Sequence, residues 1–179
     1  GTILTSTDGS IWTSQTSGTT ENLFGVTYAN SLFVAVGGSG TILTSSDGGA
    51  TWTTRDSGNT KGLRGITYEN STFVAVGYDG TIIDSSDGGG SWKNRQAAEV
   101  TSSDLNGVIY GSGSFVAVGY DISSGQGLIL TSSNAVSFTN ESTQLALYNL
   151  DDDFPEDVTV AVSSSNTAEA TVDTASMTF

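Results

Sequence analysis

Short apolar segments alternate with turns rich in Gly, Ser, Asn and Asp over roughly the first 140 residues of the chain. One stretch shows the pattern, with segments at Leu23–Tyr28, Leu32–Val36, Thr41–Ser45 and Thr51–Arg55. Segments of this length, rich in β-branched and aromatic residues and bounded by turn residues, predict strands joined by tight turns. No stretch keeps a period of 3.6 residues, so we expect almost no helix. The pattern therefore predicts a four-stranded antiparallel meander.

The same unit recurs along the chain. Phe33–Gly37, Phe73–Gly77 and Phe115–Gly119 share the sequence Phe-Val-Ala-Val-Gly, and the three Trp residues are spaced 40 positions apart. A fixed period of this length indicates one supersecondary unit copied in tandem, and four-stranded units without helix typically form a β-propeller. We expect an all-β chain with a propeller segment at 1–143. It comprises a half blade at 1–18, holding only the third and fourth strands, and blades at about 23–58, 63–98 and 105–142.

Charge and composition narrow the functional classes. The chain has 19 acidic and 5 basic residues, a net charge of −14, and neither Cys nor His. A chain this acidic is not expected to bind nucleic acids or anionic membranes. No apolar run is long enough to insert into a membrane. Thiolate zinc sites, disulfides and imidazole chemistry are excluded, and the composition fits a large secreted bacterial protein. Because Gly1 opens in the middle of a repeat, we expect the chain to be a piece of something longer.

Three turns carry Ser and Asp followed by Trp at a fixed spacing. They are Ser45, Asp47, Gly49 and Trp52; Ser85, Asp87, Gly89 and Trp92; and, one residue shorter, Ser6, Asp8 and Trp12. The pattern resembles the Asp-box, the repeat of bacterial neuraminidases. The resemblance implies a hairpin between the third and fourth strands of a blade, at its outer rim. In such a hairpin the Asp carboxylate and the Ser hydroxyl form hydrogen bonds with the backbone of the turn. The Gly permits a positive φ, and the Trp indole packs beneath the turn. Repetition favours a structural role over catalysis.

Propellers with this box include sialidases, which supply the rival interpretation. That family uses an arginine triad, an acid and a Tyr–Glu nucleophile pair. The Phe/Tyr-Arg-Ile-Pro motif is absent here, and Arg55, Arg64 and Arg95 are the only arginines. We therefore expect no enzymatic activity, the alternative being a glycan-binding or glycan-processing propeller whose active residues lie outside this chain. The repeats also resemble photosystem II assembly-factor propellers, but the net charge argues against the basic patch of that family.

Four residues form a candidate ligand face: Tyr28, Tyr68, Tyr110 and Arg64. The tyrosines recur at matching ends of the first strand, where aromatic rings stack on sugars or pack between blades; packing is the preferred interpretation. Arg64 precedes a first strand, so it either contacts a ligand at the propeller mouth or balances neighbouring acids as a solvated loop charge.

The repeat disappears near residue 144. Residues 144–179 are expected to be β-rich and resemble, in part, the immunoglobulin-like or Calx-β-like repeats of bacterial surface proteins. Alternatively, segments 145–150 and 158–162 supply the strands that the half blade lacks and close a four-bladed ring. An incomplete array is preferred, with the missing strands coming from further chain or from a second copy. An acidic cluster here is a candidate calcium site or a solvated linker: Asp151, Asp152, Asp153, Glu156 and Asp157.

Together these features predict a non-enzymatic extracellular scaffold of a bacterial surface or secreted protein. Its expected work is adhesion or assembly, with a protein or glycan partner at a cell surface or by self-association through open sheet edges. No cofactor other than calcium is expected.

Overall fold

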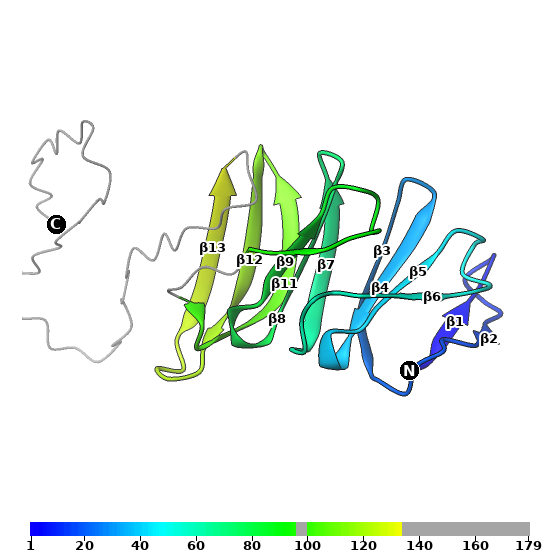
Figure 1. Cartoon of the computed structure of the whole chain (residues 1–179), viewed down its shortest axis with the longest axis horizontal. Coiled ribbons are helices and arrows are strands. Elements are labelled where there is room, and N and C mark those ends of the chain that lie inside the picture. Colours follow the sequence, from blue (N-terminus) through cyan, green and yellow to red (C-terminus); the bar gives the residue numbers. More distant parts are fainter. Residues whose placement is uncertain (96–99, 134–179) are drawn as a thin grey trace, which may run out of the picture. The chain divides into compact units, whose positions relative to one another are not determined.

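The computed structural model describes residues 1–95 and 100–133, which all lie within one compact unit, Gly1–Ser142 (Figure 1). Several predictions concern residues outside these ranges. They are the immunoglobulin-like module at 144–179, the closing strands at 145–150 and 158–162, and the calcium site at Asp151–Asp153, Glu156 and Asp157.

The described residues form four antiparallel sheets that follow one another in chain order (Figure 1). The first blade holds β3 (Leu23–Ala29), β4 (Leu32–Gly37), β5 (Ile42–Ser45) and β6 (Thr53–Arg55). The second blade holds β7 (Leu63–Glu69), β8 (Thr72–Gly77), β9 (Ile82–Ser85) and β10 (Lys93–Asn94). The third blade contributes β11 (Ser103–Gly111), β12 (Ser114–Asp121) and β13 (Gly127–Ser133). The predicted all-β architecture of four-stranded antiparallel blades is confirmed.

Helix is almost absent from the part of the chain that the structure describes. Two three-residue 3₁₀ turns, Gly38–Gly40 and Tyr78–Gly80, each join the second and third strands of a blade. No helix in the described ranges is long and apolar enough to cross a membrane.

A two-residue turn joins the first and second strands of each complete blade. Asn30 and Ser31 have φ of 50° and 59°, and Asn70 and Ser71 have φ of 48° and 59°. Two successive residues with positive φ match a type I′ turn, whose twist fits that of the flanking strands. Asn tolerates this left-handed conformation better than most residues, which explains its place at the head of both turns.

The half blade consists of β1 (Ile3–Thr5) and β2 (Thr13–Gln15). In it, Leu4 pairs with Ser14, just as Leu43 pairs with Thr54 in the first blade. β1 and β2 therefore correspond to the third and fourth strands of a blade. Among the described residues no strand pairs with the other edge of β1.

Adjacent blades pack through a repeated pair of faces. One face carries two valines and an isoleucine, and the other carries Phe, Ala and a leucine or isoleucine. Between the first and second blades these faces are Val34, Val36 and Ile42 against Phe73, Ala75 and Ile83. Between the second and third blades they are Val74, Val76 and Ile82 against Phe115, Ala117 and Leu130. All of these side chains are buried, so each interface is a small hydrophobic core of its own.

Glycine permits the first strands of neighbouring blades to approach closely. An added Cβ at Gly65 would lie 2.9 Å from the Cα of Gly107, and one at Gly25 would lie 3.1 Å from the carbonyl oxygen of Arg64. Backbone atoms cannot yield as a side-chain end does, so a larger residue would push the strands apart. The blades accordingly approach most closely at positions without side chains.

The interface pattern predicts unequal effects at one repeat position. Val76→Ala should destabilise the fold by about 2 kcal/mol, because it removes two methyl groups and leaves a cavity. Val118→Ala, at the equivalent position of the third blade, should have little effect because Val118 is 47% exposed. Urea denaturation of both variants checks this, and equal destabilisation would contradict the assignment of the two faces.

Candidate functional site

The turn between β5 and β6 is closed by Asp47. Its Oδ1 accepts hydrogen bonds from the Ser45 hydroxyl at 2.8 Å and from the backbone N–H of Thr51 at 2.9 Å, and its Oδ2 accepts one from the Thr51 hydroxyl. The Ser45 hydroxyl oxygen in turn accepts the N–H of Gly49 at 3.0 Å. The Trp52 indole N–H donates to the carbonyl oxygen of Gly49 at 2.9 Å. Carboxylate, hydroxyl and indole thus all engage the turn itself.

The other two turns repeat this geometry with small differences. Asp87 accepts hydrogen bonds from Ser85 and from the backbone and hydroxyl of Ser91. Asp8 accepts hydrogen bonds from the Ser6 hydroxyl and from two backbone N–H groups of its shorter turn. Trp12 bonds Gly9 as Trp52 bonds Gly49, whereas the buried indole nitrogen of Trp92 has no partner within the described ranges.

These hydrogen bonds stabilise the charged form of each carboxyl. The hydroxyl and backbone N–H of Thr51 lower the pKa of Asp47 to about 2, with Ser45 adding to the effect. Ser91 in the same position lowers the pKa of Asp87 well below its usual range. Backbone N–H groups of Ile11 and Ser10 lower the pKa of Asp8. An acid held as a hydrogen-bonded carboxylate is a poor proton donor at neutral pH, so the geometry suits a scaffold rather than general acid catalysis.

The turn tryptophans connect to the blade interior through contacts between tilted aromatic rings. Tyr28, Phe33 and Trp52 form one series, with ring centroids 4.5 Å and 6.4 Å apart, and Tyr68, Phe73 and Trp92 form a second with the same separations. In the half blade, which has no equivalent Tyr and Phe, Trp12 is 57% exposed.

The tyrosines of the candidate ligand face make contacts between blades. The Asn30 side-chain amide, at the turn of the first blade, donates to the hydroxyl of Tyr68 in the second. Asn70 donates in the same way to Tyr110 at 2.8 Å. Tyr28 also packs on Phe33, but it is 59% exposed because the half blade offers no such turn. Tyr68 and Tyr110 therefore hold neighbouring blades together.

Arg64 does not lie with the tyrosines. It is the second residue of β7, and Tyr68 stands four residues further on, about 13 Å away along an extended strand. It is also half-buried rather than a solvated loop charge. Its guanidinium lies over the rings of Tyr78, 4.7 Å from the centroid, and Phe24, 5.5 Å from the centroid. Its buried Nε has no hydrogen-bond partner within the described ranges.

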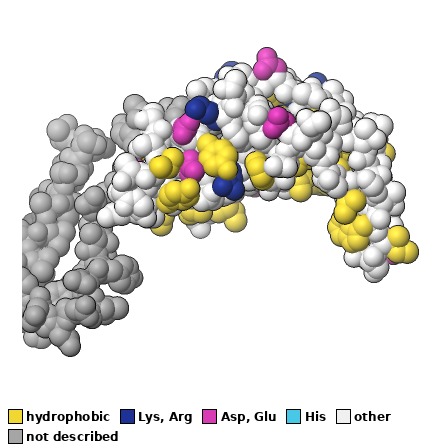
Figure 2. Space-filling view, turned by 90° about the horizontal axis from the view of Figure 1, so that it is seen from below, with side chains coloured by type: hydrophobic (Ala, Val, Ile, Leu, Met, Phe, Trp, Pro, Cys, Tyr) yellow, Lys and Arg dark blue, Asp and Glu magenta, His cyan; other side chains and the backbone are white. Residues whose placement is uncertain are grey.

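Polar groups surround this arginine in a pattern that the sequence did not indicate. The Tyr120 hydroxyl donates to the buried Asp104 carboxylate at 3.1 Å, which raises the pKa of Tyr120. Lys61 forms an ion pair with Asp79. Figure 2 shows charged side chains of both signs among hydrophobic ones on one face of the molecule. One feature of the sequence could have pointed to this cluster around Arg64. Tyr78 and Tyr120 occupy the repeat position at which the first blade has the small residue Gly38.

Asp84 is the buried carboxylate of the second blade. Arg95 donates to it at 2.6 Å, and the carboxylate raises the pKa of Arg95. In the first blade the equivalent Arg55 donates to the Thr44 hydroxyl at 3.0 Å. The pair is one blade's variant of a repeated contact between the third and fourth strands, so it has a structural role.

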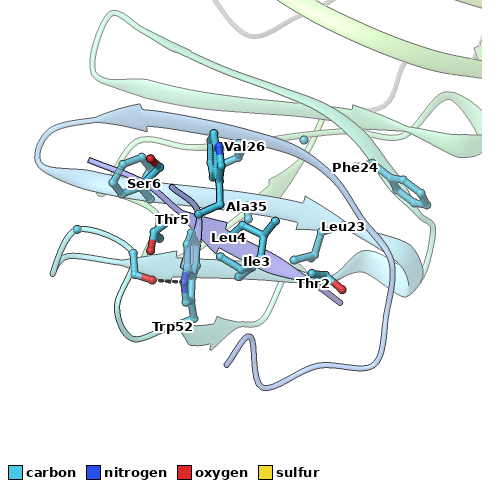
Figure 3. A pocket seen from close by; sticks show the side chains of 15 residues that line it. Thr2, Ile3, Leu4, Thr5, Ser6, Leu23, Phe24, Val26, Ala35 and Trp52 are labelled. Atoms are coloured by element: carbon cyan, nitrogen blue, oxygen red, sulfur yellow. Dashed lines mark hydrogen bonds between the residues drawn. The ribbon is translucent and has the colours of Figure 1, made fainter. Parts of the chain in front are cut away.

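An apolar cleft of about 510 Å³ separates β1 from the first blade. It is lined by Ile3 and Leu4 of β1 and by residues of the first blade that include Val26 and Trp52 (Figure 3). Phe33 of β4 also lines it. Hydrophobic side chains also gather in Figure 2 at the end of the blade array where β1 and β2 lie. The described ranges contain no group of three or more acidic side chains able to hold a metal ion.

The fold is that of a β-propeller, as comparison with solved structures shows. YCF48 from Cyanidioschyzon merolae aligns over 67% of this chain and 37% of its own, with 21% identity and a TM-score of 0.54. A structure of YCF48 bound to D1 peptide aligns over 78% of this chain and 46% of its own, with 17% identity and a TM-score of 0.53. The WD40 β-propeller domain of Doa1 aligns over 66% and 39%, with 14% identity and a TM-score of 0.50.

The likeness to these structures extends to the fold alone. The aligned chain spans less than half the length of each of these propellers. No protein-family model and no curated protein matches this sequence.

Acid should unfold the protein partly through these turns. The folded-state pKa of Asp47 lies below its ordinary value near 3.8, so its contribution to stability is complete above that value and is lost as the pH falls toward about 2. Asp47→Asn should lower the melting temperature at pH 7 and flatten its pH dependence below pH 4, whereas Glu69→Gln, at an exposed residue, should do neither. Calorimetric scans between pH 7 and about 2 check this, and identical curves for Asp47→Asn and the wild type would contradict it.

Proposed function

We propose that this chain is a non-enzymatic assembly module that binds other polypeptides through an apolar sheet face that is exposed on its third blade. The observation that carries the proposal is a contrast between equivalent residues. Val36, Val76, Ile42 and Ile82 are fully buried between blades, whereas Val118 and Ile129 of the third blade are 47% and 60% exposed. Exposed apolar faces of this kind mark interaction surfaces.

The interfaces between the described blades show which kind of surface fits the exposed face of the third blade. The second and third blades each present a face of Phe, Ala and a branched aliphatic residue to the blade before them. Another polypeptide with the same repeat offers that face on any blade whose Phe, Ala and aliphatic residue are not covered by a preceding blade. Such a head-to-tail contact joins two different surfaces, so it extends into open oligomers unless the rotation closes a ring.

The chemistry of the chain supports a scaffold better than an enzyme. The carboxylates of the three Ser- and Asp-containing turns are committed to hydrogen bonds within their own turns. That geometry also supports membership of the Asp-box repeat class, which remains part of this proposal. Composition without Cys or His and with a net charge of −14 supports an extracellular bacterial surface or secreted protein. The YCF48 structure with D1 peptide provides an example of a propeller that binds a peptide.

Self-association provides the first test. We expect the weight-average sedimentation coefficient to rise with protein concentration, and more steeply at high salt because salt screens the repulsion between chains of net charge −14. Ile129→Lys should abolish the rise. Ile122→Lys, at a residue 52% exposed in the turn after β12, should leave it unchanged. A chain that stays monomeric at every concentration and salt level would overturn the proposal.

Glycan binding is a second candidate, and Arg64 is the observation that favours it. Its guanidinium is half-buried and lies over two aromatic rings, an arrangement that orients it for the carboxylate of an acidic sugar.

A glycan array carrying sialylated and neutral sugars tests this candidate. We expect binding of the acidic sugars to be lost in Arg64→Gln and kept in Tyr28→Ala, because Tyr28 stands at the opposite end of its strand from the position equivalent to Arg64. The glycan candidate fails if the wild-type chain binds no sugar, or if Arg64→Gln binds as well as the wild type.

A further inference from the structure

The copies of the repeat differ in chemical character where the first strand begins and where the second strand ends. In each blade a Leu of the first strand pairs with the Gly that closes Phe-Val-Ala-Val-Gly. The residue after this Leu is Phe24, Arg64 or Asn106, and the residue after this Gly is Gly38, Tyr78 or Tyr120. Residues that differ between otherwise matching copies do not serve the shared fold, so they indicate a surface with a function of its own.

A β-bulge directs the side chain at the first of these positions. The pairing register of each blade shifts between the Leu and the Gly two residues later, so Phe24, Arg64 and Asn106 are extra residues on their strands. A bulge bends the strand and re-aims a side chain, and bulges are frequent beside functional sites. The backbone thus accommodates an aromatic ring, a guanidinium or an amide at the same place in successive blades.

The second blade has a neighbour packed on each of its two faces. Its Phe73, Ala75 and Ile83 meet the first blade, and its Val74, Val76 and Ile82 meet the third. Arg64 and Tyr78 of this blade nevertheless keep part of their surface exposed. Their exposure is therefore a property of a blade that is flanked on both sides.

Arg64 carries a positive charge that no described acid pairs. Lys61 forms an ion pair with Asp79, whereas Arg64 forms none within residues 1–95 and 100–133. The Asp104 carboxylate accepts hydrogen bonds from the Tyr120 hydroxyl at 3.1 Å and from the backbone N–H of Asp79 at 3.3 Å. Because the Nε of Arg64 is buried, its two Nη groups are the part of the guanidinium that can reach a ligand. Such a pair of groups matches the two oxygens of a carboxylate.

The acids around Arg64 favour a ligand with one negative charge. Arg64 and Lys61 are positive and Asp79 and Asp104 are negative, so the formal charges of these four residues sum to zero. The first negative charge of a ligand lies against Arg64, whereas a second would be repelled by Asp104 and Asp79. The net charge of −14 adds to this repulsion. A carboxylate therefore fits better than a phosphate, which carries about two charges near pH 7.

We infer that the Arg64 cluster is a subsite for the carboxylate of a sugar acid and selects it over a sugar phosphate. The cluster comprises Arg64, Lys61, Tyr78, Asp79, Asp104 and Tyr120. The inference rests on the glycan candidate and adds the charge of the ligand and a residue that determines selectivity, Asp104. The partly exposed ring of Tyr78 has its centroid 4.7 Å from the guanidinium carbon, so a sugar ring attached to the carboxylate is within reach of an aromatic surface.

Free sugars in saturation-transfer NMR are the probes. Near pH 7, glucuronate and N-acetylneuraminate should bind saturably to the full chain. Glucose lacks the charge and glucose 6-phosphate has one charge too many, so both should bind at least roughly tenfold more weakly, which corresponds to about 1.4 kcal/mol. Acetate should compete equally poorly, because it lacks the sugar ring.

Variants of the chain locate the subsite. Arg64→Asn places at the bulge the residue that the third blade carries there, so it should abolish binding of both sugar acids without lowering the melting temperature appreciably. Lys93→Gln is the matched control. It removes the same charge from an exposed residue of β10, at the opposite edge of the blade from β7, and should leave binding unchanged.

Asp104→Asn tests the selectivity. Loss of this negative charge should strengthen binding of glucose 6-phosphate more than binding of glucuronate, and lower the ratio of their affinities roughly tenfold. The wild-type chain provides the same test without a substitution. Between about pH 7 and about pH 5 the phosphate loses one charge, and its affinity should approach that of glucuronate. A ratio that changes in neither experiment overturns the inference.

The outcomes separate this inference from the glycan candidate. Acidic sugars may be bound on the array through Arg64 while glucose 6-phosphate or acetate binds as tightly as glucuronate near pH 7; the glycan candidate then stands and the inference is overturned. If neither the array nor NMR detects binding of any acidic sugar, both fail. The assembly function is tested separately by sedimentation and is affected by neither result.

Discussion

The packing of one blade on the next is the contact on which the rest of the structure depends. Two valines and an isoleucine of one sheet meet Phe, Ala and an aliphatic residue of the following sheet, and the same match occurs twice. A single blade of four short strands has two apolar faces and cannot bury either alone. Burial of these faces therefore depends on the neighbouring blades, and Val118 and Ile129 of the third blade are exposed where the equivalent residues of the first two blades are buried.

Three further structural features stabilise the blades. On the first strand, glycine permits close backbone approach, as at Gly65 beside Gly107. In the hairpin between the third and fourth strands, the carboxylates of Asp47 and Asp87 stabilise the turn, since the hydrogen bonds that each accepts come from its own turn. At the turn between the first and second strands, Asn70 reaches the next blade and binds Tyr110. A net charge of −14 is thus compatible with a stable fold, because part of the negative charge is stabilised by oriented N–H and O–H groups rather than by bases.

Most of the fold could be predicted from local sequence patterns. The contacts between residues distant in the sequence could not. Strands such as Leu32–Gly37 were predictable because apolar runs and turn residues alternate at short range. The sequence grouped Arg64 with the tyrosines as one ligand face, whereas in the structure the length of β7 separates Arg64 from Tyr68. The stacking of Arg64 on Phe24 and Tyr78 joins residues from separate hairpins and leaves no periodic signal. The Asn-to-Tyr bonds did leave one, because donor and acceptor are 38 and 40 positions apart, close to the repeat length itself.

The bond from Asn70 to Tyr110 has a consequence for how such a chain lengthens. The second blade carries both the donor to its successor, Asn70, and the acceptor from its predecessor, Tyr68, so duplicating this unit within the gene creates matched junctions without any compensating mutation. Duplication then preserves the hydrogen bonds between blades, and recombination changes the number of blades by whole units.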